Sequence, residues 1–459
     1  MEKDLDRATG APGDFAVGGV RGHILRLALP MTAAQLINLL YSIVDRMYLG
    51  RMPGAGGLAL TGVGLVLPII SILNSVGGLC GTGGAPLFSI ARGRGDNEEA
   101  ERIMGNSFAL LMIFGAILTA GIIIFKRPIL FAFGASEATY PYASEYLSIY
   151  TTGTLFVMTG LGMNPFINAQ GSAKRGMMTV ALGAVVNIVL DPIFIFVLDM
   201  GAAGAALATV IAQACSAAWV LLFLTGKHAI IRLRLSDMRL GAARVRRIIT
   251  LGLSGFVMNL TNSLIQIVCN TTLLKYGGDL FVGVMTVINA VREIVFMPVS
   301  GIGGGAAPVL GFNYGAGKQE RVKAGIRFSS SITIAYTAAI WAVIMLAPSA
   351  MTRIFTDEIT IIEAGVRPIR LYFMLSMFMS LQMVSQQVFV ALGKSKQAIF
   401  FSLLRKAFIA APLTLLLPAL GLGVTGVFVA DTISQVVGGV TCFATMYLVV
   451  YRKLGKDLT

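Results

Sequence analysis

Long apolar runs alternate with short polar connections along the whole chain. Each run reaches the roughly 20 residues that a helix needs to cross the hydrocarbon core of a bilayer, and Gly, Pro and charged residues separate the runs. This pattern predicts transmembrane helices, with ends defined to within several residues. The twelve predicted spans are 24–49, 59–91, 103–125, 139–168, 177–198, 202–225, 247–275, 280–311, 325–348, 359–390, 397–419 and 422–451.

Composition agrees with this pattern. Of 459 residues, 56% are hydrophobic and only 13% are charged, and the mean hydropathy is +0.80, whereas a soluble protein carries about 25% charged residues. The fold class predicted is an all-α polytopic membrane protein in a lipid bilayer. The net charge of +14 resides in the connections between spans, which is an orientation signal and not a sign of nucleic-acid binding.

The distribution of Lys and Arg sets the predicted orientation. Connections after even-numbered spans are rich in both, above all the segment 226–247. Because cytoplasmic loops carry the excess of positive charge, these connections and both termini are predicted to be cytoplasmic. We expect a multi-pass protein of the plasma membrane, meaning a bacterial or archaeal cytoplasmic membrane. The connections after odd-numbered spans hold only Arg51, Lys126, Arg127, Lys275 and Arg353.

The cysteines and histidines do not indicate a metal centre. Cys80, Cys215, Cys269 and Cys442 all lie in apolar runs without ligand spacing, so we interpret them as small buried hydrophobes. His23 and His228 stand alone near the ends of runs.

The two halves of the chain repeat one another. The segment GTGGAPLFSIARGRGDNEE at 81–99 matches GIGGGAAPVLGFNYGAGKQER at 301–321 when Pro86 is aligned with Pro308, an offset of 222 residues. Each half holds six spans, so both enter the membrane in the same direction. This predicts two parallel six-helix bundles, related by an axis along the membrane normal, around a central cleft that supports alternating access. The predicted parts are a flexible tail 1–22, lobes 23–225 and 247–451, a basic linker 226–246 and a tail 452–459.

Asp191 is an ionisable residue inside an apolar run of bilayer length, where a charge is costly. It stands directly before Pro192 in the run NIVLDPIFIF at 187–196. An acid at the centre of a span costs about 2.5–3.5 kcal/mol on insertion scales, so it is a functional-site hypothesis by default. Pro192 lacks an amide hydrogen and biases Asp191 away from regular helix, which would leave nearby carbonyls free to accept from a cation or a protonated acid.

Three further polar residues fall at the membrane depth of Asp191. Asn187 lies one turn earlier on the same face, and Asp45 and Thr209 lie in the outer halves of their spans. We predict that Asp45, Asn187, Asp191 and Thr209 form a cation site for H⁺ or Na⁺. The alternative is that the acids only hold helices together. At the offset of 222, the repeat equivalents of Asn187 and Asp191 are Ile409 and Leu413. Near the start of each half the offset is 224, which aligns Asp45 with Cys269, so the acid site is a feature of the first half.

Other polar and flexible residues are candidates for a substrate cleft. Asn38 and Tyr41 share one stripe of the first span, and the seventh span carries a polar strip at helical spacing. The tenth span combines Met with Gln, and thioethers suit varied apolar ligands, although ordinary packing explains them equally well. Asp431 and Glu293 are open to both a functional and a structural interpretation. The remaining candidates are Asn259, Asn262, Gln266, Met374, Gln382 and Gln386.

The chain resembles the multidrug and toxic compound extrusion (MATE) family over nearly its whole length. The resemblance rests on VDRMYLGR (44–51), the paired Gly-Pro segments quoted above, NAQGSAKR (168–175), NIVLDPIF (187–194), GAAGAALAT (201–209) and GFNYGAGK (311–318). It is similar to the DinF/MepA-like branch, whose cation site in the N-terminal lobe falls on the four residues named above. The branch that binds sodium in its C-terminal lobe uses an acid in span seven, and span seven here has none.

The resemblance implies a function as well as a fold. It implies a monomeric secondary transporter that exports amphipathic, often cationic, organic compounds by antiport with H⁺ or Na⁺, with no cofactor. The alternative is a flippase for a lipid-linked or polysaccharide precursor, which should show a cationic cleft. Only Arg292, Arg405 and Lys406 fit such a cleft. No nucleophile–base or metal constellation is present, so we do not expect an enzyme.

Overall fold

The computed structural model describes residues 13–50 and 56–454, and within them every regular element is a helix. The first 12 residues of the predicted tail, Arg51 in the predicted first outer loop, and residues 455–459 lie outside the described residues. The long elements of the first half are α2 (Val20–Gly50), α3 (Gly56–Gly93), α4 (Asn97–Ala132), α5 (Tyr140–Thr152), α6 (Thr154–Ala169), α7 (Ala173–Pro192), the π-helix η1 (Ile193–Val197) and α8 (Gly201–Thr225).

The second half continues the same pattern. A 3₁₀ turn, η2 (Leu235–Met238), precedes a 74-residue helix. The elements that follow are α9 (Ala242–Gly315), α10 (Gln319–Leu346), α11 (Pro348–Arg353), α12 (Ile359–Phe373), α13 (Ser376–Ala391), α14 (Ser395–Leu403), η3 (Leu404–Ala410), α15 (Ala411–Leu417), η4 (Pro418–Leu422), α16 (Gly423–Met446) and η5 (Tyr447–Tyr451).

Every predicted span coincides with helical structure. In the described part of the chain, eight helices are long and apolar enough to cross a membrane, or nine when the pair α12 and α13, bent by 50°, counts as one span. Two of these are double spans. Gly278 interrupts α9 with φ 68°, between predicted spans seven and eight, and the stretch Ser395–Tyr451 contains spans eleven and twelve. Together α5 and α6 make the predicted fourth span.

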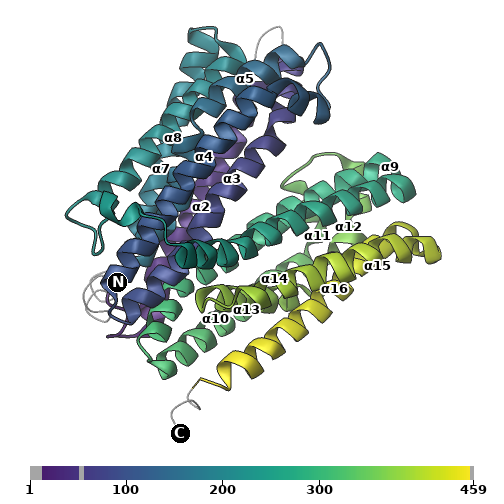
Figure 1. Ribbon diagram of the computed structural model, residues 1–459. Helices are drawn as coiled ribbons and strands as arrows, with labels where there is room; N and C mark the ends of the chain where they lie inside the picture. Colours follow the sequence, from purple (N-terminus) through teal and green to yellow (C-terminus); the bar gives the residue numbers. More distant parts are fainter. Residues whose placement is uncertain (1–12, 51–55, 455–459) are drawn as a thin grey trace. The chain divides into compact units, whose positions relative to one another are not determined.

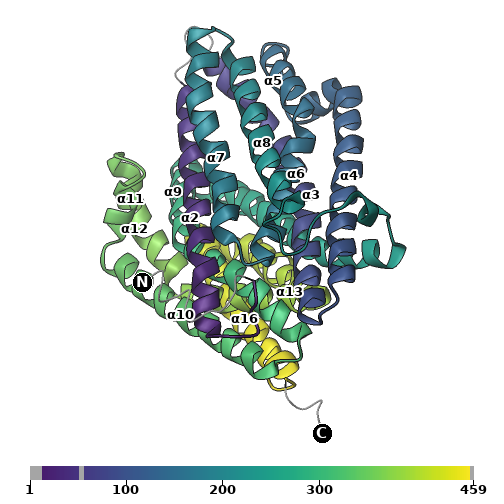
Figure 2. The ribbon, with the colours of Figure 1, turned by 90° about the vertical axis from the view of Figure 1, so that its left-hand side faces the viewer.

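The chain divides into two compact units (Figures 1 and 2). The N-terminal unit contains Leu29–Gly252, and the C-terminal unit contains Phe15–Ala28 together with the chain from Leu253 onward. The helices α2 and α9 therefore each contribute residues to both units. These borders lie near the predicted borders of the lobes, except that the basic segment 226–246 is part of the N-terminal unit.

In the N-terminal unit, α3, α4, α5, α6 and α8 pack against one another and α7 packs on α6 and α8. Figure 2 shows these helices side by side in one bundle. The core is aliphatic and fully enclosed, as the side chains of Val66, Leu73, Leu147 and Ala205 illustrate, each at most 1% exposed. Burial of such side chains contributes roughly 1.5–3 kcal/mol for each large one.

In the C-terminal unit, α13 packs on α10 and α16, and α12 packs on α16. Its core includes Leu273, Ile288, Phe373 and Phe428, each at most 1% exposed. These contacts repeat those of the N-terminal unit, where α6 packs on α4 and α8 and α5 packs on α8.

The segment before α2 does not behave as the predicted flexible tail. Phe15 is only 2% exposed, and its ring packs edge-on against Phe312 with centroids 5.6 Å apart. Its carbonyl accepts hydrogen bonds from Asn313 Nδ2 at 3.0 Å and from Arg321 Nη2 at 2.8 Å. An aromatic anchor and charge-assisted hydrogen bonds hold residues 15–18 to the turn between α9 and α10.

The repeat found in the sequence is also present in the backbone. Glycines 222 positions apart adopt the same left-handed conformation at equivalent connections, where a residue with a Cβ would be strained. The pairs are Gly95 (φ 79°) with Gly317 (68°), Gly171 (82°) with Gly393 (73°), and Gly201 (56°) with Gly423 (51°).

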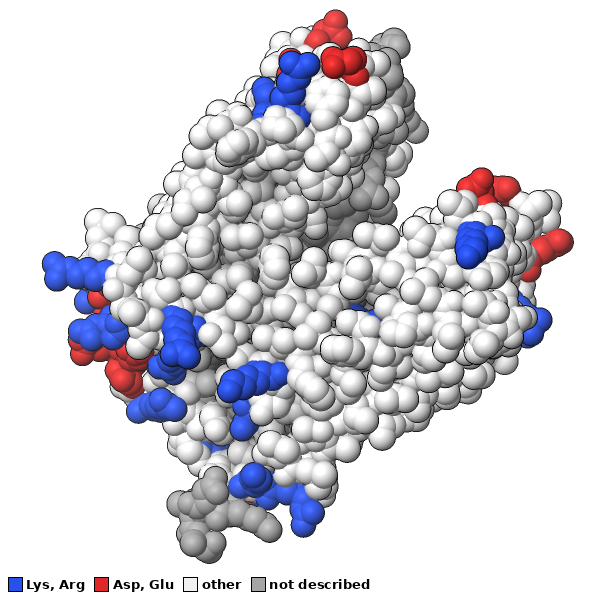
Figure 3. Space-filling view, turned by 45° about the vertical axis from the view of Figure 1, so that its right-hand side comes forward, with Lys and Arg blue, Asp and Glu red and all other residues white. Residues whose placement is uncertain are grey.

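The sides of both units are apolar. On the face drawn in Figure 3 they are mostly white, with the charged side chains gathered near the ends of the helices. Large aliphatic and aromatic side chains point outward, for example Ile124 (70% exposed), Leu222 (71%) and Phe408 (70%). Exposed apolar flanks on helices whose backbone groups are paired internally are the surface expected in lipid.

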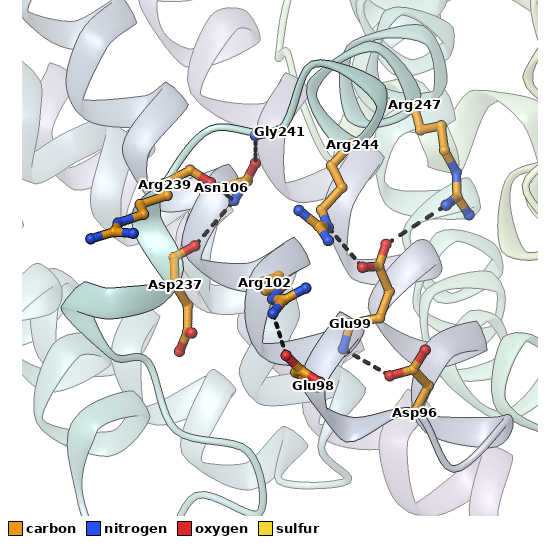
Figure 4. Close-up of polar contacts among 10 residues, drawn as sticks. All are labelled: Asp96, Glu98, Glu99, Arg102, Asn106, Asp237, Arg239, Gly241, Arg244 and Arg247. Carbon is orange, nitrogen blue, oxygen red and sulfur yellow. Dashed lines mark hydrogen bonds and ion pairs between the residues drawn. The ribbon is translucent and has the colours of Figure 1, made fainter.

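The predicted basic linker folds onto the end of α4 (Figure 4). Asn106, which is fully buried, donates from Nδ2 to the carbonyls of Asp237 (3.1 Å) and Arg239 (2.9 Å) and accepts from the amide of Gly241 at 2.9 Å. Glu99 pairs with Arg244 at 2.7 Å. The linker is thus a clamped part of the N-terminal unit.

Replacing Asn106 by Ala should destabilise the protein by about 2 to 4 kcal/mol, because three hydrogen bonds are lost and buried backbone groups remain unsatisfied. The measurement is the midpoint of thermal unfolding of the purified protein in detergent. Asn97→Ala, at an exposed position in the first turn of α4, is the matched control. Equal midpoints for the two variants would show that the clamp contributes nothing.

Candidate cation-binding site

The end of α7 carries two of the four predicted site residues. Asn187 and Asp191 are 1% and 0% exposed, and a spacing of four residues places them on one face of the helix. The expectation that Asp191 would leave the regular helix is wrong, since α7 continues through Pro192. The irregular backbone begins one residue later, where the chain widens into η1 (Ile193–Val197). Such π-helical turns are frequent at functional sites.

A hydrogen-bond chain links α7 to α8. Asn187 Nδ2 donates to Asp191 Oδ1 at 3.2 Å and to Thr209 Oγ1 at 3.3 Å. Thr209, itself 5% exposed, donates to the carbonyl of Ala205 at 2.9 Å. The side-chain amide of Asn187 therefore donates both of its hydrogens within the site, and these two hydrogen bonds fix the orientation of the side chain.

Asp45 joins this group from α2. Its carboxyl lies within electrostatic range of the Asp191 carboxyl. All four predicted residues therefore lie together inside the N-terminal unit, brought there by α2, α7 and α8.

Three tyrosines complete the surroundings. Tyr41, predicted only as a cleft residue, lies one turn before Asp45 and reaches Thr209 with its hydroxyl. Tyr146 on α5 also reaches Thr209, and its ring stacks on that of Tyr150 with centroids 6.2 Å apart. Neither Tyr146 nor Tyr150 is among the residues predicted from the sequence. Their spacing of four residues in an apolar helix was the available signal.

The site contains more acceptors than donors. Asn187 Oδ1 and Asp191 Oδ2 are buried and receive no hydrogen bond. A buried acceptor without a donor costs about 1–3 kcal/mol. Either a proton shared by the two carboxyls or a cation held by carboxylate, amide and hydroxyl oxygens would satisfy these atoms, and hard cations such as Na⁺ prefer oxygen ligands. The arrangement is chemically suited to exchange one positive charge.

The other predicted cleft residues are distributed differently. Asn38 is exposed on α2, in the N-terminal unit, and the rest lie in the C-terminal unit. Gln382 and Gln386 are buried there and donate to the carbonyls of Phe401 and Ala398 on α14, each at 3.3 Å. Asp431 accepts from Gln435 Nε2 at 2.6 Å. The exposed candidates of this unit are Asn259, Asn262, Gln266, Glu293 and Met374.

Taken together, lipid-facing helices, a twofold internal repeat and a buried acid cluster define a polytopic membrane transporter. A family model described as MatE matches residues 30–193 and 255–416, once in each half. The chain belongs to the MatE family, and the resemblance seen in the sequence is confirmed.

Individual relatives agree with this assignment. The chain is 23% identical over 430 residues to the multidrug export protein MepA of Staphylococcus aureus (strain NCTC 8325 / PS 47), covering 93% of each chain. It is 24% identical over 346 residues to MepA of Staphylococcus haemolyticus (strain JCSC1435), covering 75% of each.

Solved structures share the fold. An outward-facing multidrug resistance MATE family transporter of the MOP superfamily superimposes with a TM-score of 0.89 at 22% identity, covering 96% of this chain and 98% of the other. A MATE structure in the bent conformation gives 0.90 at 22% identity, with the same coverage. The predicted fold class is therefore confirmed.

Proposed function

We propose that this protein exports amphipathic organic compounds, cationic ones among them, by antiport with H⁺ or Na⁺. The observation that carries the proposal is the pairing of the buried carboxyl of Asp191 with the half-buried carboxyl of Asp45, with Asn187 and Thr209 around them. The MepA relatives, which are named multidrug export proteins, support organic compounds as the class of substrate.

The coupling ion would bind at the acid cluster. Two carboxyls that share one buried site disfavour a double negative charge, so the site gains a proton or a cation when it is closed to water and releases it when it is hydrated. Antiport requires that the ion and the substrate stabilise different conformations, since a ligand with equal affinity for both shifts nothing. The π-helical turn η1, which begins directly after Pro192, is our candidate for the element that changes.

The proposal also covers the location, orientation and oligomeric state of the protein. We place the protein in the plasma membrane with both termini in the cytoplasm, because the basic connections are those after even-numbered spans. We also propose that it works as a monomer, since every residue of the acid cluster comes from one chain.

Transport in liposomes tests the proposal. Purified protein is reconstituted, ethidium is supplied as the fluorescent cation, and a proton gradient and a sodium gradient are imposed in separate experiments. We expect only one of the two gradients to drive ethidium movement, and that gradient identifies the coupling ion. Movement that neither gradient accelerates, above liposomes without protein, would overturn the proposal.

A further inference from the structure

The C-terminal unit contains a second buried charged cluster, and its sign is opposite to that of the acid site. Arg292 on α9 and Arg405 and Lys406 on η3 lie within electrostatic range of one another and of Asp431 on α16. Arg405 and Lys406 are 6% and 8% exposed. Charged side chains inside a membrane span are costly and mark substrate or ion pathways.

Two acids lie near the three cations: Asp431, and Glu293 beside Arg292. Within the described residues, no ion pair of 4.0 Å or less joins Asp431 to Arg292, Arg405 or Lys406. Asp431 is instead held by Gln435 on its own helix. The formal charge of the cluster is therefore positive.

The cationic groups are positioned by neutral partners and keep a donor free. Arg405 Nη1 donates to Gln382 Oε1 at 3.2 Å, Lys406 Nζ donates to the carbonyl of Met258 at 3.2 Å, and Arg292 Nη1 reaches the Tyr372 hydroxyl at 3.4 Å. Arg405 Nε is buried and has no acceptor. An unpaired charged donor in such surroundings favours binding of an acceptor that carries negative charge.

The backbone makes room for Arg405. A Cβ at Gly438 on α16 would lie 2.7 Å from Arg405 Cγ, so only glycine admits the arginine stem there. In the N-terminal unit the equivalent positions, 222 residues earlier, are Gly183 and Ser216, and the glycine is on the other helix. The repeat equivalents of Arg292 and Lys406 are Ile70 and Ala184. The basic cluster is therefore confined to the second half, as the acid cluster is to the first.

The cluster is accessible from the surface of its unit. Arg292 and Asp431 are both half-buried, while Arg405 and Lys406 are buried. The π-helical backbone of η3 places two consecutive cationic residues in this position, and π-helical turns are frequent at functional sites.

We propose that Arg292, Arg405 and Lys406 bind the anionic group, a carboxylate or phosphate, of an amphipathic organic compound. This inference rests on the proposed export function and adds to its substrates compounds that carry a negative group. Asp431 weakens anion binding by repulsion. Binding to the isolated protein needs no gradient, so failure here and failure of antiport are separate results.

Equilibrium binding of three dansyl probes to the purified protein in a neutral detergent tests the proposal. Dansylglycine carries a carboxylate, dansylamide is neutral and dansylcadaverine is a cation. We expect dansylglycine to bind at least about tenfold more tightly than dansylamide, as a charge-assisted hydrogen bond requires. Equal affinities for the two would overturn the proposal. The affinity for dansylcadaverine, compared between the wild-type protein and Asp191→Asn, reports on the acid cluster.

Variants assign the binding to the cluster. Arg405→Gln and Lys406→Gln should each weaken the binding of dansylglycine by about tenfold or more. Arg405→Lys should retain much of the affinity. Asp431→Asn, which keeps an oxygen for Gln435, should strengthen it. Arg246→Gln, which removes one exposed charge elsewhere, should change nothing.

Asp431→Asn is expected to raise the affinity for dansylglycine, so it still tests the proposal if the variants of Arg405 and Lys406 do not fold. Weaker or unchanged binding in Asp431→Asn would contradict the proposal. Competition by octanoate and octyl phosphate then compares the two head groups on one alkyl chain, and displacement by neither would also contradict it.

Discussion

Replacement of Asp191 by Asn is expected to reduce gradient-driven efflux to the level of liposomes without protein. An amide has the shape of the carboxyl and still offers an oxygen to Asn187 Nδ2, yet it neither releases a proton nor supplies the charge that holds a cation. Asp45→Asn should have the same effect, because the two carboxyls are direct neighbours. The measurement is ethidium movement under the gradient that drives the wild-type protein.

The chain provides a matched control for this loss. Asp199 follows η1 on the surface and has φ 52°, a left-handed conformation that Asn also adopts readily. Asp199→Asn removes the same charge eight residues away and should transport normally. Size-exclusion profiles and unfolding midpoints must match the wild type for all three variants. Normal efflux in Asp191→Asn and Asp45→Asn would remove the ion-site assignment.

The helices were predictable because their cause is local. Each span is a run of apolar residues of bilayer length, and even the break inside α9 was expected, since Gly277, Gly278 and Asp279 interrupt the apolar pattern. The assembly of Asp45, Asn187, Asp191 and Thr209 was also predictable, because residues at equal depth in neighbouring spans come within reach of one another. Whether they bind a cation stays a prediction.

Helix rotation was not predictable to the same degree. Gln382 and Gln386 have the spacing of a cleft-lining stripe, but the structure turns both toward α14, where they cap buried carbonyls. Arg405 and Lys406 are neighbours in the sequence, but only the packing of the helices brings them within electrostatic range of Arg292, which lies in a different span. In the sequence, Tyr146 cannot be distinguished from an ordinary core residue. Which face of a span meets which neighbour depends on packing between helices, and hydropathy does not encode it.

The close approach of α3 and α6 depends on a glycine at the contact. A Cβ at Gly81 would lie 2.7 Å from the carbonyl oxygen of Gly162 and 3.2 Å from its Cα. Because both are backbone atoms, no rotamer change relieves the contact, and small residues at such positions are what permits dense helix packing in lipid. Gly81→Ala should therefore force the two helices apart and cost about 1–3 kcal/mol.

Gly78, one turn earlier on α3, provides the comparison. A Cβ at Gly78 has no neighbour within 4 Å, so Gly78→Ala should be neutral or stabilising by up to about 1 kcal/mol through helix propensity alone. Thermal unfolding of both variants in the same detergent measures the difference, and the yield of monodisperse protein gives an independent check. Because the two substitutions add the same methyl group to the same helix, an equal response would mean that α3 and α6 do not depend on this contact.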